Sequence, residues 1–416
     1  MKFHRYIAPS VFFALVFTVS FAAATFGEPK RAEIVSFDSV LTHALSTSPL
    51  VKEVDAVLAA RLAESMETSL YLNPQLGAGV GLPASPAGDA DRTQISLTLS
   101  QPFRPSDFGI RQVVAELLSK SASVEQRLSL LELSQSIYLS YAKLWILQEQ
   151  RRLLTEQRER ARRISEKVTA ATSRGALSKG EGGLFAAEYK KLSAQLLGVD
   201  ADAAREQSNL LRLSAFPVTG RRFESPDKAL KISADGLMQG LQEGDLPIQS
   251  RYALLAKVAS EREKLSRRDA FPAVAPQLTY QRTEDGGDFV GLGVQFELPL
   301  FNRNQADILR RQGEAAATAA KDAYSRSDLF REEVTLFLRS VEALQKQAET
   351  YETEVVPSLL GALKSYDEQF SAGTGTVLSV WQAQREISNA QLAMLELWTR
   401  FFASRSDLSI LTGQQL

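Results

Sequence analysis

The sequence contains no cysteine. Disulfides, thiolate metal ligands and a lipid-modified N-terminal cysteine are therefore excluded. Histidine is almost as scarce, because only His4 and His43 occur. A single histidine beyond the N-terminal region cannot build a metal site, and no nucleophile motif accompanies His43 that would indicate a Ser/His/Asp hydrolase. We therefore expect no catalytic residues, no cofactor and no bound metal.

An excess of either charge and long apolar runs are also missing. The chain has 48 basic and 49 acidic residues, a net charge of −1, and this balance gives no indication of a nucleic-acid partner. Beyond the N-terminal region, no stretch reaches the roughly 18 apolar residues of a membrane-spanning helix. Outer-membrane strands, at about 9–11 residues each, escape such a search.

The N-terminal residues have the pattern of a secretory signal. Lys2 and Arg5 give a positive start, and residues 7–21 form an apolar run that is short for a membrane span. Small residues follow, so the pattern predicts a signal peptide over residues 1–24. Cleavage is expected after Ala24, with Gly27 as the second option, and an uncleaved anchor is the alternative.

The chain repeats itself at an offset of about 198 residues, which is too long for the unit of a solenoid. The matching landmarks are Pro49 with Pro247, Pro74 with Pro276, Pro102 with Pro299, and Gly175 with Gly373. Each copy has the order short helix, two strands, very long helix, glycine break and long helix. We interpret this as the duplication of one helix–hairpin–helix unit.

The two copies have the following predicted bounds. The first repeat covers residues 36–216, with strands over 75–83 and 93–102 and helices over 107–172 and 182–213. A linker over 217–245 follows, packed on the outside, with a possible short strand at 229–232. The second repeat covers 246–412, with strands over 276–283 and 289–298 and helices over 305–370 and 377–411.

The four predicted strands alternate apolar side chains with glycine or polar ones. Ile95, Leu97 and Leu99, for example, alternate with serine, threonine and glutamine. Two structures fit this pattern. One is a half-buried sheet of a soluble protein. The other is a barrel closed from several chains, apolar towards lipid and polar towards a water-filled lumen.

The long helices are the second unusual feature. No proline or interior glycine interrupts residues 110–172. In residues 334–355, apolar side chains recur at alternating spacings of three and four residues, which is the pattern of a coiled-coil seam. Pro357 lies where this seam changes register, so we expect a kink or local adjustment there. A short break between long helices makes an antiparallel hairpin. Hairpins of this length need neighbours to bury their seams, which indicates a ring of chains.

Three local segments carry a family resemblance across residues 36–412. They are Leu298-Pro299-Leu300-Phe301-Asn302-Arg303-Asn304-Gln305, then Val356-Pro357 followed by Tyr366 and Gly373, and Ala383-Gln384-Arg385. Together with the repeat, they resemble the TolC-like outer-membrane efflux proteins. The first segment is similar to the one found in the subgroup that serves cobalt–zinc–cadmium type heavy-metal efflux.

This resemblance implies a mainly α-helical chain with a membrane β portion, assembled as a homotrimer. Three chains would form a 12-stranded β-barrel in the cell outer membrane, continued by an α-helical periplasmic tunnel. The expected partners are outer-membrane lipid, a periplasmic adaptor protein and an inner-membrane pump. The chain would then be a passive exit duct for heavy-metal cations. Alternatives are a duct for drug efflux or type I protein secretion, and a pore-less periplasmic coiled-coil scaffold.

The resemblance also suggests residues for a gate at the tips of the helical hairpins. Gly175 and Gly373 would give the tips their backbone freedom. Family members often carry acidic side chains just past these glycines, where they form a ring that attracts cations. Glu181 fits that pattern in the first copy, whereas Ser379 and Gln382 stand at the matching places in the second copy. Glu181 is therefore either part of a ring or a solvated tip residue.

The strand-to-helix corner of the second copy is the other candidate site. Pro299, Asn302, Arg303 and Asn304 form this corner. Arg303 is expected to hydrogen-bond loop carbonyls there, with an ordinary surface arginine as the alternative. Asn304 is a plausible N-cap for the helix that follows.

Overall fold

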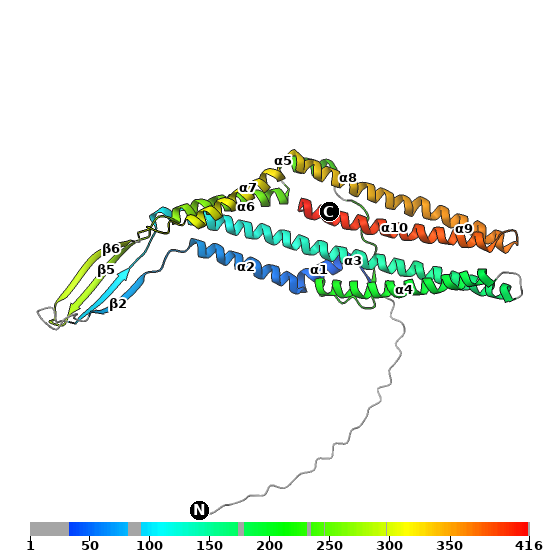
Figure 1. The fold of residues 1–416 in the computed structure, drawn as a ribbon, viewed down its shortest axis with the longest axis horizontal. Helices are drawn as coiled ribbons and strands as arrows, with labels where there is room; N and C mark the ends of the chain where they lie inside the picture. The colour runs from blue at the N-terminus through cyan, green and yellow to red at the C-terminus, as the bar shows by residue number, and fades with distance from the viewer. Residues whose placement is uncertain are drawn as a thin grey trace, which may run out of the picture.

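The computed structural model describes residues 33–81, 93–173, 179–230, 234–244, 246–296 and 298–414. The predicted signal peptide over residues 1–24 and the tip residue Gly175 lie outside these ranges. The described chain is elongated, with a sheet at one end and long helices that run from it to the other end (Figure 1).

The sheet has four antiparallel strands, β2 (Gln75–Gly81), β3 (Gln94–Ser100), β5 (Val274–Thr283) and β6 (Asp288–Phe296). Their order is β2-β3-β5-β6, so the hairpins of the two repeats pair with each other through β3 and β5. The register aligns side chains of one kind across all four strands. One row reads Leu76, Leu99, Leu278 and Leu292, and the next row reads Gly77, Thr98, Thr279 and Gly291.

The first repeat contributes four helices. They are α1 (Phe37–Thr47), α2 (Pro49–Ser69), α3 (Ile110–Ser173) and α4 (Lys179–Ser214), and a 3-10 turn over Pro105–Asp107 precedes α3. The 64 residues of α3 correspond to about 95 Å at a rise of about 1.5 Å per residue. Buried Ser48 caps α2 and donates a hydrogen bond to the Leu213 carbonyl at 2.7 Å, which joins the end of α4 to the start of α2.

The second repeat contains α6 (Pro247–Asp269), α7 (Gln305–Ser325), α8 (Asp328–Thr350), a π-helical turn (Tyr351–Val355), α9 (Val356–Ser371) and α10 (Val377–Thr412). The expectation of one continuous helix over 305–370 is wrong. Arg326 ends α7, and Ser327 caps α8 by accepting a hydrogen bond from the backbone N–H of Phe330. A serine that caps in this way favours a new helix start over a continued helix.

The adjustment expected near Pro357 is present as the π-helical turn, which ends two residues before the proline. Pro357 has no backbone N–H to satisfy the carbonyl four residues earlier, and a π turn is one way in which a helix absorbs such a defect. The corresponding part of α3 is regular α-helix. The second repeat therefore has a π-helical turn where the first repeat has regular α-helix.

The linker crosses the middle of the helical body. Its strand β4 (Arg222–Phe223) pairs in parallel with β1 (Ile34–Val35), and its helix α5 (Ala234–Glu243) packs beside α8 at the bend that is visible in Figure 1. The possible strand at 229–232 does not appear at Ala229 and Leu230, which are irregular. Its last two residues lie outside the described ranges.

The largest apolar core lies at this same middle level. Fully buried Trp398, Phe401 and Phe402 of α10 pack with Tyr138 of α3 and with buried residues of α8. Aromatic edge-to-face contacts, such as Tyr138 with Phe402 at 6.0 Å between ring centroids, add to the burial. In the part of the chain that the structure describes, no helix combines the length and the hydropathy needed to cross a membrane.

Candidate functional sites at the two ends of the helical body

The strand-to-helix corner of the second repeat is closed by its own side chains. Arg303 Nε donates a hydrogen bond to the Pro299 carbonyl at 3.3 Å. Asn302 Oδ1 accepts from the backbone N–H of Asn304 at 3.0 Å. Because the arginine binds a loop carbonyl rather than an acid, it holds the turn that redirects the chain from β6 into α7.

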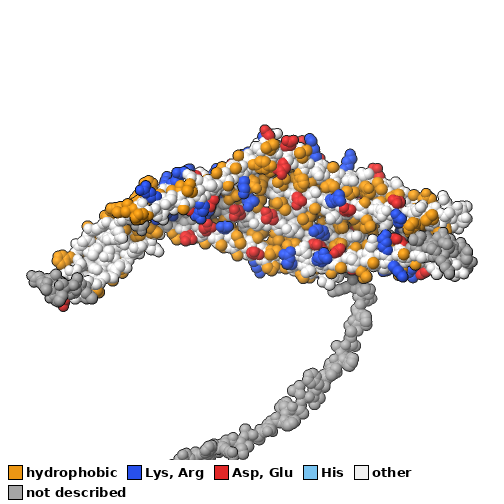
Figure 2. All heavy atoms as spheres, viewed as in Figure 1, with side chains coloured by type: hydrophobic (Ala, Val, Ile, Leu, Met, Phe, Trp, Pro, Cys, Tyr) orange, Lys and Arg blue, Asp and Glu red, His pale blue; other side chains and the backbone are white. Residues whose placement is uncertain are grey.

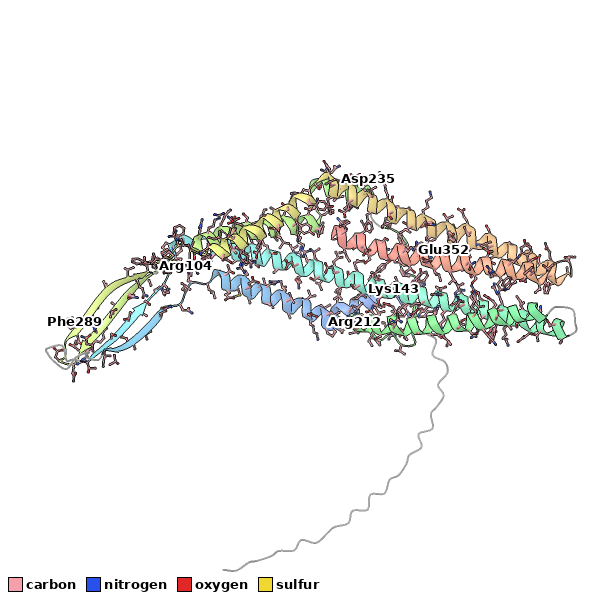
Figure 3. All side chains as sticks on the ribbon, in the orientation of Figure 1. Arg104, Lys143, Arg212, Asp235, Phe289 and Glu352 are labelled. Carbon is pink, nitrogen blue, oxygen red and sulfur yellow. The ribbon has the colours of Figure 1, made fainter. Side chains whose placement is uncertain are left out.

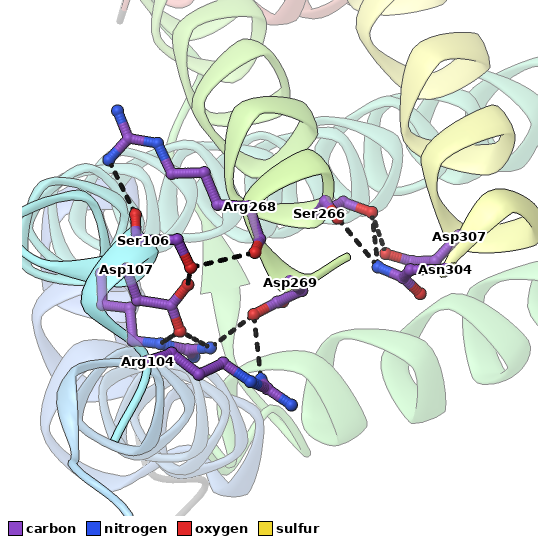
Figure 4. A network of polar contacts seen from close by, with 9 residues as sticks. Arg104, Ser106, Asp107, Ser266, Arg268, Asp269, Asn304 and Asp307 are labelled. Atoms are coloured by element: carbon purple, nitrogen blue, oxygen red, sulfur yellow. Dashed lines mark hydrogen bonds and ion pairs between the residues drawn. The ribbon is translucent and has the colours of Figure 1, made fainter. Parts of the chain in front are cut away.

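Asn304 occupies the N-cap position of α7, but its side chain makes no capping hydrogen bond. Its φ of +58° lies in the left-handed region, which asparagine tolerates better than most residues. Its Nδ2 instead donates to the backbone carbonyl of Ser266 at 2.9 Å and to the Ser266 hydroxyl at 3.2 Å (Figure 4). The capping expectation was therefore right about the position and wrong about the hydrogen bond.

A cluster of charges next to this corner was missed by the sequence analysis. Arg111 donates to Asp107 and Asp269, each at 2.7 Å, and Arg104 donates to Asp269 at 3.1 Å (Figure 4). Burial raises the pKa of the Asp269 carboxyl above its usual value, and the neighbouring Arg111 opposes that effect. The cluster ties the β3–α3 corner of the first repeat to the end of α6 in the second.

Apolar side chains are exposed at this level of the molecule. A groove of about 670 Å³ is lined by polar residues that include Arg104 and Asp269 and by apolar residues that include Phe271 and Phe301. Phe301 is 93% exposed, more than any other large apolar residue of the described chain. The exposed apolar residues therefore continue from the sheet into the loops that join it to the helices.

The described turn at the opposite end joins α9 to α10. Gly373 has a φ of +77°, which favours glycine. A Cβ atom at Gly375 would lie 2.9 Å from the backbone nitrogen of Phe370, so a larger residue does not fit there. Thr376 caps α10 by accepting from the backbone N–H of Ser379 at 3.2 Å.

No carboxylate stands at the predicted gate positions of this second tip. Ser379 bonds to Thr376 through its hydroxyl at 2.8 Å, and Gln382 is exposed one turn into α10. In the first tip, the backbone of Glu181 lies in the first turn of α4, but its side chain lies outside what the structure describes. A Glu181 ring therefore stays a prediction.

Basic residues gather near the tips instead. A groove of about 300 Å³ between α3, α9 and α10 is lined by Arg160, Arg163 and Lys167, with Asp367 as its one acidic residue. None of the three cations makes an ion pair with another described residue. This groove near the tips is therefore mainly basic.

Known proteins resemble this chain in sequence over its second repeat and in fold over most of its length. The family model described as "outer membrane efflux protein" matches residues 252–414, which make up nearly all of the second repeat. Over 91% of the chain, the fold is similar to those of solved outer-membrane channels of the TolC-like kind. No curated protein matches the sequence.

Three solved structures illustrate the similarity of fold. The outer membrane protein VceC of Vibrio cholerae is 19% identical, with a TM-score of 0.72 over 91% of this chain and 96% of that one. A membrane protein from Pseudomonas aeruginosa is 15% identical, with a TM-score of 0.75 over 98% and 97%. The outer-membrane channel OprN is 16% identical, with a TM-score of 0.74 over 91% and 90%.

Proposed function

We propose that this chain is the outer-membrane exit duct of a tripartite efflux system, working as a homotrimer with a periplasmic adaptor and an inner-membrane pump. The observation that carries the proposal is the sheet. Its apolar row is exposed in the chain, with Leu292 at 88% and Leu76 at 69%. A row this apolar is unstable in water, and lipid is a medium that would cover it on all sides.

The other face of the sheet suits a water-filled lumen. Thr98 and Thr279 lie within hydrogen-bonding distance at 3.3 Å, and Gln281 donates to Gln94 at 2.8 Å. In the view of Figure 2, Lys, Arg, Asp and Glu are scattered over the helical body, while the sheet end is almost entirely uncharged. A passive duct for varied cargo needs small, polar, uncharged walls of this kind.

The edges of the sheet support closure from several chains. Within the described part of the chain, β2 and β6 each pair on one side only. Because all four strands are antiparallel, β6 of one copy meets β2 of the next in an antiparallel sense. Three copies would close a 12-stranded barrel, which leaves no unpaired edge in lipid. The helical hairpins of the three copies would continue it as a periplasmic tunnel.

For the cargo, we propose heavy-metal cations, on the resemblance of residues 298–305 to that subgroup. Organic compounds are the second candidate, and the basic groove of Arg160, Arg163 and Lys167 favours them because it repels cations. Ion selectivity distinguishes the two. A cation-preferring channel supports the first, and a channel with no preference or an anion preference supports the second.

Release of entrapped solute tests whether the chain is a duct. Liposomes loaded with carboxyfluorescein and reconstituted with the purified chain should leak dye at a rate that rises with protein content. Heat-denatured protein is the control. Liposomes that retain the dye at every protein content, with the chain inserted, would contradict the proposal.

A further inference from the structure

The second helical hairpin, made of α8, the π-helical turn, α9 and α10, differs from its first copy at one level. Glu352 lies in the π-helical turn, while its counterpart 198 residues earlier, Leu154, is buried in the core of the first hairpin. Trp398 has Asp200 as its counterpart, an exposed residue that pairs with Arg151. Where the first hairpin has a buried leucine and a surface ion pair, the second hairpin therefore has a different set of contacts.

That constellation is built around a lysine from the linker. Lys228 Nζ donates to both carboxylate oxygens of Glu352, at 2.6 and 2.7 Å. The same ammonium stands 4.6 Å from the ring centre of Trp398 and 5.4 Å from that of Trp145. Trp398 Nε1 donates to Glu352 at 3.2 Å. One lysine thus connects the π-helical turn with α10 and α3. Glu352, its partner in the π-helical turn, is labelled in Figure 3.

The linker that carries Lys228 is itself held firmly. The preceding carbonyl, that of Asp227, accepts from buried Arg405 at 2.7 Å. The Tyr141 hydroxyl lies 2.9 Å from the carbonyls of both Val35 and Glu224. Lys228 therefore projects from a fixed segment, and its contact restrains the helix rather than the loop.

Packing between the two hairpins weakens on the tip side of this level. The large core ends here, and a small cluster of Leu363, Val380 and Ile387 takes its place, with Ile164 as its contact from the first hairpin. Among the described residues, polar contacts join the hairpins here as well, as between Gln157 and Gln391 at 3.2 Å. A groove of about 300 Å³ separates α3 from α9. Among the residues that the structure describes, the tip half of the second hairpin thus packs in a smaller apolar cluster than the half nearer the sheet.

We infer that the π-helical turn is a hinge for the tip half of the second hairpin, and that Lys228 is the latch that holds this hinge in its resting position. A π turn carries a hydrogen-bonding pattern that differs from its flanking helices, and such turns recur at functional sites and bends. The lysine contacts the turn itself. Loss of its charge would free α9 and the following turn to change angle relative to α3, while the first hairpin, whose α3 continues unbroken through this level, stays in place.

Distances between spin labels test this inference, and the absence of cysteine makes labelling specific. One label pair, Thr169→Cys with Glu368→Cys, spans the two hairpins from exposed positions. A second pair, Thr169→Cys with Ala187→Cys, lies within the first hairpin. Labelled chain is mixed with an excess of unlabelled chain, so that each measured pair belongs to one molecule.

Lys228→Met keeps the length of the side chain and removes its charge, and Glu352→Gln keeps an acceptor for Trp398. Each should broaden or shift the distance between the hairpins by several ångströms and leave the distance within the first hairpin unchanged. The double variant should add little to either single one, because the two residues act as a pair. Lys120→Met is the matched control, because it breaks an exposed pair with Glu116 far from the hinge.

Two results would overturn the latch. One is an unchanged distance between the hairpins in both Lys228→Met and Glu352→Gln. The other is a change of the same size within the first hairpin or in Lys120→Met, since that would mean general loosening. The inference concerns the helical body alone, so it stands or falls independently of whether the chain conducts.

Discussion

Arg111 in the first repeat and Asp269 in the second lie 2.7 Å apart, at the level where strands give way to helices. Neither side chain is more than 28% exposed. The pair joins the two repeats beside the sheet, and Arg104 of the first repeat adds a second ion pair to Asp269 at 3.1 Å.

Removing this pair should destabilise the chain. Asp269→Asn leaves Arg104 without a carboxylate partner and removes one of the two carboxylate partners of Arg111. We therefore expect the free energy of unfolding to fall by about 1–3 kcal/mol, a figure already reduced because the side chains are partly exposed. Thermal unfolding of Asp269→Asn, Arg111→Met and the double variant measures the coupling. Lys120→Met, with its exposed pair, should cost no more than about 0.5 kcal/mol. Equal effects at the two places would contradict a special role for the cluster.

Stability should fall in alkaline solution because of Tyr138. Burial raises the pKa of its phenol to about 12, with the charge of Arg405 opposing the rise, whereas the unfolded chain titrates near 10. The unfolded state thus loses its proton first. Stability is complete below pH 10 and declines as the pH rises towards 12, by about 2–3 kcal/mol for this group. Tyr138→Phe should flatten this decline, as followed by circular dichroism. A decline as steep as that of the wild type would refute the assignment.

The turn at the second tip should depend on glycine at one position and not at a nearby one. Gly375→Ala places a Cβ against the Phe370 backbone and should disorder the turn at a cost of about 1–3 kcal/mol. Gly361→Ala, in α9 with open space around it, should be neutral or stabilise by up to about 1 kcal/mol. Limited proteolysis with mass spectrometry locates the cuts. Equal sensitivity of the two variants at residues 371–376 would rule out the steric argument.

The two faces of the sheet should respond in opposite ways to charge. Leu97 and Thr98 are neighbours in β3 and therefore lie on the apolar and the polar face of the sheet respectively. Leu97→Lys should cost about 2–4 kcal/mol near the middle of the bilayer and reduce the chain recovered in the outer membrane. Thr98→Lys should be recovered as the wild type. Equal recovery of both would mean that the apolar face of the sheet does not face lipid.

The amino-acid pattern was enough to predict the alternation of the strands and the adjustment beside Pro357. Both depend on local spacing, because a strand alternates every second residue and a proline acts on the turn before it. The break between α7 and α8 at Arg326 and Ser327 was not predicted. A serine within a helical pattern can stay in the helix or cap a new one, and only the bend of the folded chain shows which of the two applies. The partners of Lys228 and Asp269 were also out of reach. Glu352 lies 124 residues from Lys228 along the chain and Arg104 lies 165 residues from Asp269, and only the packed helices bring them together.

The most direct test of the central claim is the single-channel conductance of the purified assembly, together with its mass, after extraction from outer membranes. We predict a mass of three chains and stepwise, ohmic currents that persist without any added energy source. A monomer in the soluble periplasmic fraction, or an assembly that inserts into the bilayer and carries no current, would contradict the account.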